Sequence, residues 1–222
     1  IENHCQKDKF GESTIQSIYY DTPNFEIIRK SIEKPDYKEK LRSRSYGLAD
    51  ENSEIFFEIK KKFNGIVYKR RIKTTQQKID YILKYPYSFE SADQITREIA
   101  HFAKTYENLE PKYLIAYDRI AYKWDGDLRI TFDQNPRFRT TDLSLSTSLE
   151  GRPLLNKGEV IMEIKTSFAM PLWLSRLLSS QKAYKQSFSK VGKAYEIDML
   201  SRLTLTRKEY LATHTIAMGG VM

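Results

Sequence analysis

The sequence has few of the residues that build covalent cross-links or metal centres. Among its 222 residues are one cysteine, Cys5, and three histidines that lie far apart along the chain. A single cysteine excludes an internal disulfide and suits a reducing compartment, so we expect a cytoplasmic protein. It also excludes a zinc site built from several cysteines. The isolated histidines favour ordinary surface or core roles.

Long hydrophobic runs and the common nucleotide-binding motifs are absent as well. No apolar stretch approaches the ~18 residues that a membrane-spanning helix needs, and the amino-terminal residues are too polar for a signal peptide. There is no Walker-type phosphate loop and no dinucleotide-binding glycine motif. Apolar residues make up 40% and charged residues 30% of the chain, which is typical of a folded globular protein. We therefore expect one domain over residues 1–222 and no transmembrane segment.

Positive charge is what the sequence has in excess. The chain contains 37 lysines and arginines against 29 aspartates and glutamates, a formal net charge of +8. Such an excess favours anionic partners, namely nucleic acid, phosphates or an acidic membrane surface. Charge alone also fits a basic protein with no such partner, so the placement of the cations has to decide.

The most unusual stretch runs from Lys38 to Arg44. Its period-two alternation predicts a strand in which Lys38, Lys40, Arg42 and Arg44 share one side, about 6.6 Å apart from one to the next. Four cations in one row repel each other and stabilise no core. The row must therefore face either water or a polyanion.

A β-hairpin is the clearest local prediction. Two strand-like runs, 55–63 and 66–72, flank Asn64-Gly65, the strongest short hairpin signal. With a two-residue loop, Phe63 pairs with Ile66, which sets Lys60 opposite Lys69 and Glu58 opposite Arg71. One side then carries mixed charge. The other side is apolar, and we expect it to lie under helices: Ile55, Phe57, Ile59, Phe63, Ile66, Tyr68 and Ile72.

The remaining pattern alternates strands with a few helices. Strands are predicted at 17–21, 113–122, 128–133 and 159–165, and helices at 25–32, at 93–109 and from Pro171 onward. Residues 140–158 read as a long connection. In the tail, 203–206 is strand-like, and a helix over 207–218 ends at Gly219-Gly220.

Glu-Ile-Lys occurs twice, at 58–60 and 163–165, each time on a strand whose other side is apolar. One interpretation is a wall of a polyphosphate and metal site, in which Glu163 and Glu58 hold a hard divalent cation through oxygen. Lys60 and Lys165 would then neutralise phosphate oxygens. The alternative is a solvated strand side or an internal ladder of salt bridges.

Arginines extend the same pattern to other strands. Arg42 and Arg44 could bind phosphates bidentately, or contact nucleic acid, or simply lie on an exposed edge. Arg119 and Arg129 lie on the side of their hairpin opposite the core. Closing the sheet into a barrel would make these sides converge on a polar interior, with the helices outside. The predicted fold is therefore α+β: an antiparallel β-barrel with helices packed on the outside.

An ordered set of motifs resembles a known family. It comprises Tyr-Tyr-Asp-Thr-Pro (19–23), Lys-Leu-Arg-Ser-Arg-Ser-Tyr-Gly (40–47), Phe-Glu-Ile-Lys-Lys-Lys (57–62), Ala-Tyr-Asp-Arg-Ile-Ala-Tyr (116–122), Leu-Arg-Ile-Thr-Phe-Asp (128–133), Met-Glu-Ile-Lys (162–165) and Ser-Phe-Ser-Lys (187–190). Over residues 13–195 the chain resembles the VTC polyphosphate polymerase domain of the triphosphate tunnel metalloenzymes, which are related to CYTH enzymes. The resemblance implies an eight-stranded antiparallel tunnel that transfers the terminal phosphate of ATP to a polyphosphate chain.

The resemblance also implies site residues, a cofactor and partners. Catalytic roles would fall to Arg42, Arg44, Lys60, Arg119, Lys165 and Lys190. Phosphate binding would fall to Lys40, Lys69, Arg71, Arg129, Ser189 and Arg202. Mn²⁺ or Mg²⁺ would be bound by Glu163 and Glu58. The expected partners are ATP or another triphosphate, polyphosphate, and a membrane protein acting in trans.

One departure from the family concerns the two ends of the chain. Family members open with a strand carrying a Glu-x-Lys-Tyr type motif and then a helix, and neither precedes the 19–23 motif here. Residues 200–222 look like that strand and helix moved to the carboxyl end, which suggests a circular permutation. The moved strand would close the barrel. Arg202 would stand at a phosphate-contacting lysine and Leu200 at an expected acid, which puts catalytic strength in doubt.

Two other functions stay open. The first is a hydrolase of the same fold that cleaves inorganic triphosphate, because only the shape of the tunnel decides whether water or a chain end accepts the phosphate. The second is a binding module for polyphosphate or RNA without turnover. Nucleic acid is disfavoured, because Phe57 and Tyr68 fall on the side opposite Lys60 and cannot interleave with the cations for stacking.

Overall fold

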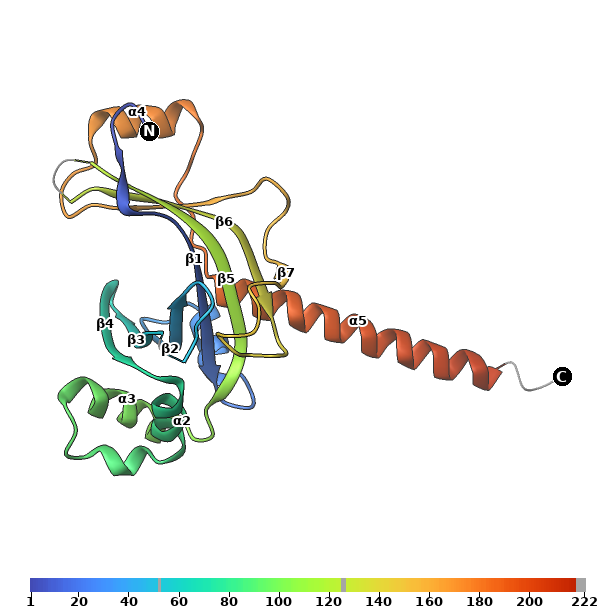
Figure 1. The fold of residues 1–222 in the computed structure, drawn as a ribbon. Coiled ribbons are helices and arrows are strands. Elements are labelled where there is room, and N and C mark those ends of the chain that lie inside the picture. The colour runs from blue at the N-terminus through green and yellow to red at the C-terminus, as the bar shows by residue number, and fades with distance from the viewer. Residues whose placement is uncertain (52, 125–126, 219–222) are drawn as a thin grey trace.

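The protein is built around one curled antiparallel sheet, seen in the computed structural model of residues 1–51, 53–124 and 127–218 (Figure 1). The strands are β1 (Gln6–Asp21), β2 (Tyr37–Tyr46), β3 (Ile55–Phe63), β4 (Ile66–Thr74), β5 (Glu110–Lys123), β6 (Arg129–Arg139), β7 (Arg152–Pro153) and β8 (Ile161–Lys165). The helices are α1 (Glu26–Ile32), α2 (Gln76–Lys84), α3 (Gln94–Thr105), α4 (Leu172–Ser180) and α5 (Lys190–Met218), with a 3₁₀ turn η1 (Pro86–Phe89). None of these helices is long and apolar enough to cross a membrane.

The β3–β4 hairpin forms with the predicted register. Phe63 pairs with Ile66, Lys60 with Lys69 and Glu58 with Arg71. Asn64 and Gly65 both take positive φ, 46° and 85°, as a two-residue primed turn requires. The predicted strands at 17–21, 113–122, 128–133 and 159–165 also form, although β1 begins much earlier than expected. Within 140–158 only the two-residue β7 pairs with the sheet, so that segment is the long connection predicted.

Helices pack on both sides of the sheet, in three apolar clusters. Phe57 and Ile59 of β3 are fully buried in a core that includes Ile79 and Ile82 of α2 and Phe102 of α3. A second core, on the other side of the sheet, packs α1 and the start of α5 against β1, β5 and β6. A third packs α4 against β5, β6 and β8. The prediction that helices supply the core from outside is confirmed for β3.

The tip of the β3–β4 hairpin corrects part of that prediction. Phe63, Ile66 and Tyr68 were expected under helices but are 50%, 59% and 47% exposed. The reason is length, because α2 and α3 cover only the part of the hairpin near Phe57 and Ile59. Helix α2 was not predicted from the sequence. It begins where the side chain of Thr75 accepts the backbone N–H of Lys78, an N-terminal cap.

Closure into a barrel is not observed among the described residues. The strand order is β4-β3-β2-β1-β5-β6-β7, with β8 also paired to β6, so β4 at one end and β7 and β8 at the other each have one neighbour. The prediction of an antiparallel sheet is confirmed, and the sheet is open. The strand expected to close it, 203–206, is not a strand.

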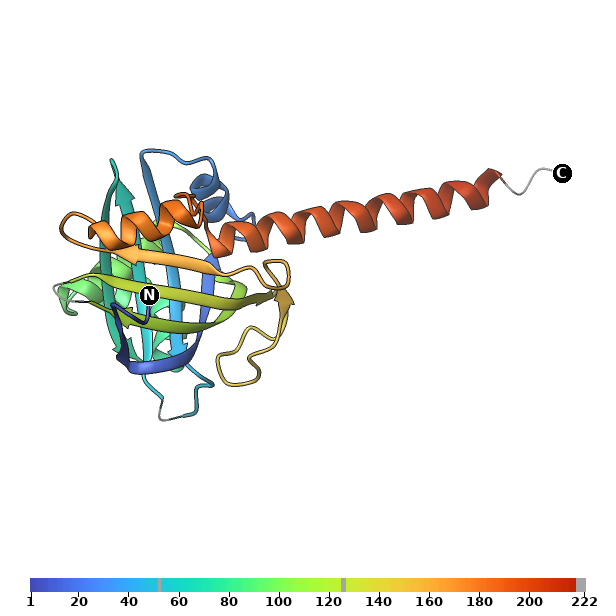
Figure 2. The same cartoon turned by 90° about the horizontal axis from the view of Figure 1, so that it is seen from above.

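Residues 190–218 form a single helix that leaves the body of the molecule (Figures 1 and 2). The predicted strand at 203–206 is wrong because these residues follow three helical turns docked through Val191, Ala194 and Ile197. Extending an existing helix costs far less than nucleating a new element. The predicted helix over 207–218 is confirmed. The cap at Gly219-Gly220 and the packing of Tyr210, Leu211 and Ile216 lie outside the described residues and side chains.

Candidate functional site

The side of the sheet opposite α2, α3 and α4 is lined by charged and tyrosine side chains, next to the core that α1 and the start of α5 form. Strand pairing aligns Tyr19 with Arg42 and Arg42 with Glu58 across β1–β3. On the other half of the sheet it aligns Arg119 with Asp133 across β5 and β6. We call this side the polar face. It gathers cations that the sequence analysis selected from separate strands: Lys40, Arg42, Arg44, Lys60, Lys69, Arg119, Arg129 and Lys165.

Glu58 is the centre of the first group of charges, and its side chain is only 1% exposed. One carboxylate oxygen accepts the Nε and Nη2 of Arg42 at 2.8 and 2.7 Å and lies 3.7 Å from Arg44. The other oxygen lies 3.2 Å from the Lys69 ammonium. Burial lowers the pKa of Lys69, an effect that Glu58 opposes. Both oxygens of Glu58 are therefore engaged by cations.

Asp133 is the centre of the second group and is also 1% exposed. Arg119 donates to both of its oxygens, at 2.6 and 2.9 Å, in the bidentate geometry that favours arginine. Lys190, the first residue of α5, donates to it at 2.5 Å. Burial works to raise the pKa of Asp133, but the bonds from Arg119 and the charges of both cations outweigh it and lower the pKa. Asp133 is thus ionised at neutral pH.

Two tyrosines lie between these groups. Arg42 donates to the Tyr19 hydroxyl at 3.2 Å, and Lys190 and Arg119 lie 4.4 and 5.1 Å from the centre of the Tyr117 ring. Burial works to raise the pKa of Tyr19, but the cations Arg42, Lys40 and Lys190 outweigh it and the pKa is lowered. The rings fix the cations in place without neutralising them.

Lys40 and Ser189 connect β2 to the start of α5. The Lys40 ammonium donates to the Ser189 hydroxyl at 2.8 Å, and the same oxygen accepts the backbone N–H of Gly192 at 3.1 Å. Burial, reinforced by Lys60, Lys38 and Arg42, lowers the pKa of Lys40 to about 8, against an opposing effect of Tyr19. Ser189 and Lys190 therefore bring the start of α5 against both halves of the polar face.

Glu163 is the most accessible carboxylate of the face described so far. Its side chain is 45% exposed and lies 3.2 Å from Lys165 and 3.8 Å from Arg119. Burial alone would raise the pKa of Glu163, but the charges of Lys165, Arg119 and Lys190 outweigh it and lower the pKa. No group of three or more His, Cys, Asp or Glu side chains within the described ranges could hold a metal ion. The residues present fit a divalent cation bound by Glu163 together with substrate phosphate oxygens, as Mg²⁺ commonly binds.

The structure separates several of the selected residues from the centre of the face. Arg71 stacks 4.8 Å over Phe56, and Arg129 lies at the far end, 2.7 Å from Asp8. Arg202 is not on the polar face. It lies on α5, pairs with Asp198 at 3.1 Å and lies over the ring of Phe25, whose neighbours belong to a helix-covered core.

Sequence reasoning assigned no role to three residues that organise the site: Asp133, Tyr19 and Tyr117. Asp133 was considered only as the last residue of the 128–133 motif. The available signal was the period-two alternation of β5 and β6. It places Arg119 and Asp133 on the same side of their hairpin, opposite the core. From Lys123 and Arg129, which flank the hairpin loop, the register runs without a shift to Arg119 and Asp133, and the bulge between Ala116 and Asp118 lies beyond this pair. The pairing could therefore be counted once the length of the loop was known.

Comparisons with known proteins agree with this architecture. The family model of the VTC domain matches residues 1–197, whereas none of the curated proteins compared with the chain matches it. A candidate adenylate cyclase from Bacillus halodurans superposes with a TM-score of 0.52 at 10% sequence identity. The match covers 82% of this chain and 81% of the Bacillus chain. The PH1819 protein of Pyrococcus horikoshii OT3 gives 0.46 at 13% identity, with coverages of 88% and 90%. A candidate adenylyl cyclase from Hippeastrum, with a dominant triphosphatase activity, gives 0.36 at 16% identity, with coverages of 60% and 61%.

The solved structure from Bacillus halodurans is too distant in sequence to indicate more than a common fold. The family model is more specific, because it spans most of the chain and contains the strands whose cations form the polar face. On the match over residues 1–197, the chain belongs to the VTC domain family.

Proposed function

We propose that this chain is a metal-dependent polyphosphate polymerase domain, which transfers the terminal phosphate of ATP to a growing polyphosphate chain. The observation that supports this is the polar face, where cations from β2, β5 and α5 are held by buried carboxylates, a hydroxyl and tyrosine rings. Arg42, Arg119 and Lys190 each lie 2.5–2.7 Å from a carboxylate oxygen whose side chain is 1% exposed. A row of fixed cations suits a linear polyanion better than a compact neutral substrate.

Catalysis would rest on positioning and charge neutralisation. A terminal oxygen of the polyphosphate acceptor attacks the γ-phosphorus of ATP, the bond from that phosphorus to the β–γ bridging oxygen breaks, and ADP leaves with the electron pair. Arg119, Lys190 and Lys165 would hold the transferred phosphoryl group, whose oxygens gain cationic partners as negative charge shifts toward the leaving group. Arg42, Arg44 and Lys40 would hold the remaining phosphates. Ser189 would donate a hydrogen bond to phosphate when Lys40 turns toward substrate.

Glu163 is the proposed metal ligand. Bound Mn²⁺ or Mg²⁺ would neutralise phosphate oxygens and orient them, which is the chemistry that a hard cation supplies in phosphoryl transfer. Glu58 is the weaker candidate because its two oxygens already contact Arg42 and Lys69. A cation would have to displace these partners from a buried position. We therefore propose that Glu58 positions Arg42.

A triphosphatase of the same fold is the second candidate. The observation that favours it is the open sheet, since β4 and β8 have no strand between them in the described part of the chain. Water entering through that opening could accept the phosphate in place of a polyphosphate end. Both reactions need the same cations, so the polar face alone does not separate them.

Incubation with ATP and Mn²⁺ tests both candidates. A polymerase gives a long-chain product on a gel, and a triphosphatase gives only free phosphate. Glu163→Gln should lower turnover at least a hundredfold while keeping most of the tripolyphosphate affinity, because the cations remain. Glu159→Gln, an exposed carboxylate just before β8, is the matched control and should keep full activity. Near-normal turnover of Glu163→Gln over a range of Mn²⁺ concentrations would remove Glu163 as the ligand.

A further inference from the structure

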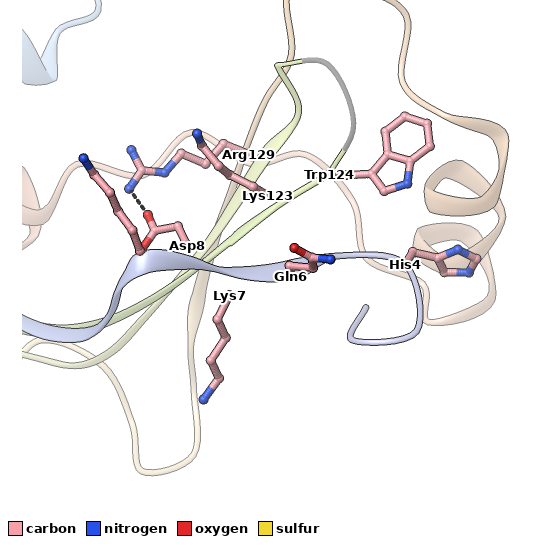
Figure 3. Close-up of a pocket in the computed structure, with 8 residues that line it drawn as sticks. His4, Gln6, Lys7, Asp8, Lys123, Trp124 and Arg129 are labelled. Carbon is pink, nitrogen blue, oxygen red and sulfur yellow. Dashed lines mark hydrogen bonds and ion pairs between the residues drawn. The ribbon is translucent and has the colours of Figure 1, made fainter.

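A cavity of about 690 Å³ lies at the end of the polar face, beside the first residues of β1 (Figure 3). Its volume falls within the ~300–1,000 Å³ usual for small-molecule sites. The residues that line it are four cations, one carboxylate, two aromatic rings and one amide. The cations are Lys7, Lys9, Lys123 and Arg129, the carboxylate is Asp8, the rings are His4 and Trp124, and the amide is Gln6.

Strand pairing makes the cavity continuous with the centre of the polar face. Lys123 pairs with Arg129 across β5 and β6, and Arg129 pairs with Lys165 across β6 and β8. Arg129 precedes Asp133 by four residues on the same side of β6, about 13 Å at ~3.3 Å per residue. A track of cations therefore leads from the cavity to Arg119 and Lys190.

The two ends of the cavity differ in chemistry. Figure 3 shows Arg129 and Lys123 at one end, with Arg129 bonded to Asp8, and Trp124 and His4 at the other, beyond Gln6. The aromatic end is held in place by Trp173, which stacks on His4 at 4.3 Å and meets Trp124 edge-on at 6.1 Å. The cavity thus has a fixed aromatic end and a cationic end that opens onto the phosphate track.

We infer that this cavity binds the nucleoside end of a nucleoside triphosphate. The heterocyclic base would lie against Trp124 and His4, since flat bases stack on aromatic side chains. The phosphates would run past Lys123 and Arg129, placing the terminal phosphate deepest, at Arg119 and Lys190. This inference rests on the proposed function. It adds a site that distinguishes a nucleoside triphosphate from inorganic triphosphate, which has nothing to place at the aromatic end.

Binding measured by calorimetry tests the inference without turnover. Wild-type protein and Trp124→Ala are titrated with ATP and, separately, with tripolyphosphate. Trp124→Ala should weaken ATP binding by about tenfold, a typical cost of losing one stacked base, and change tripolyphosphate binding by less than twofold. Tyr87→Ala removes another aromatic side chain, 72% exposed on η1 and absent from the cavity lining, and should alter neither ligand. Unchanged ATP binding, or equal weakening of both ligands, overturns the assignment.

Fluorescence supplies a second measurement that does not require Trp124→Ala to fold. The chain has two tryptophans, so Trp173→Phe leaves Trp124 as the only reporter. ATP should quench its emission and tripolyphosphate should not, and equal responses to both overturn the assignment. If the wild-type protein binds neither ligand, the proposed function fails as well. If it binds tripolyphosphate but shows no Trp124-dependent preference for ATP, only the cavity assignment fails.

Discussion

Glu58 and Asp133 hold the two halves of the polar face together in different ways. Each is about 1% exposed and contacts several cations. The partners of Glu58 come from the adjacent strands β2 and β4, so they are fixed by the sheet itself. Those of Asp133 come from β5 and from α5, an element 57 residues further along the chain.

The difference shows how a site can be assembled on an open sheet. On the β2–β4 half, strand pairing alone brings the charges together. On the β5–β8 half, where no strand joins β8 to β4 among the described residues, the start of α5 makes the connection. Lys190 binds Asp133, and Ser189 next to it accepts from Lys40 of β2. Side-chain contacts thus span an opening that backbone pairing leaves.

Asp133→Ala should give the largest effect. It leaves Arg119 and Lys190, whose side chains are 15% and 17% exposed, without their anion. Removing one partner from a buried ion pair costs ~3–5 kcal/mol, which urea denaturation would measure as a lower free energy of unfolding. Asp80→Ala, an exposed carboxylate on α2, is the control and should stay within ~0.5 kcal/mol of wild type. A loss of unfolding free energy below ~1 kcal/mol would show that docking of α5 does not depend on the contact between Asp133 and Lys190.

Glu58→Gln should cost less, about 2 kcal/mol. The amide oxygen can still accept from Arg42, and Lys69, 43% exposed, can turn to water. The same denaturation experiment checks it. A loss as large as that of Asp133→Ala would mean that the strand-fixed half of the face depends on its carboxylate as strongly as the helix-linked half.

Binding of tripolyphosphate should weaken by about tenfold between pH 7 and pH 9 as Lys40, with its pKa lowered to about 8, loses its charge.

The same shift in the pKa of Lys40 should make the free energy of unfolding rise with pH. The folded pKa of Lys40 lies below the unfolded value near 10.5, so the unfolded chain holds more protons between these values, and the contribution of Lys40 to unfolding free energy rises over that window. Lys40→Arg should flatten the binding profile; an unchanged profile would assign the dependence to another group.

Arg202→Ala should give the smallest effect, because the Arg202 side chain is 57% exposed and Asp198 keeps its hydrogen bond from Tyr113. Ion pairs at the surface contribute ~0.2–1 kcal/mol. Tripolyphosphate affinity should not change, which tests the original prediction that Arg202 binds phosphate. A clear loss of affinity, measured by calorimetry, would contradict the position of α5 described here and restore that prediction.

The sequence by itself determined the features that depend on neighbours along the chain. Period-two alternation placed Arg42 and Glu58 on the polar side of their strands. The Asn64-Gly65 turn predicted which residues of β3 and β4 pair with each other. These follow from strand geometry and from the positive φ that a two-residue hairpin turn requires. Helix α1 and helix α3 were predicted in the same local way.

Only the tertiary structure decided which charges meet and whether the sheet closes. Nothing local to Asp133 indicates Lys190, because their contact depends on how α5 docks against β1, β5 and β6. The same docking overrides the strand-like pattern at 203–206, since a helix already anchored by its first turns extends more readily than a four-residue strand forms without a partner. Distant contacts are set by packing of whole elements, which local periodicity does not specify.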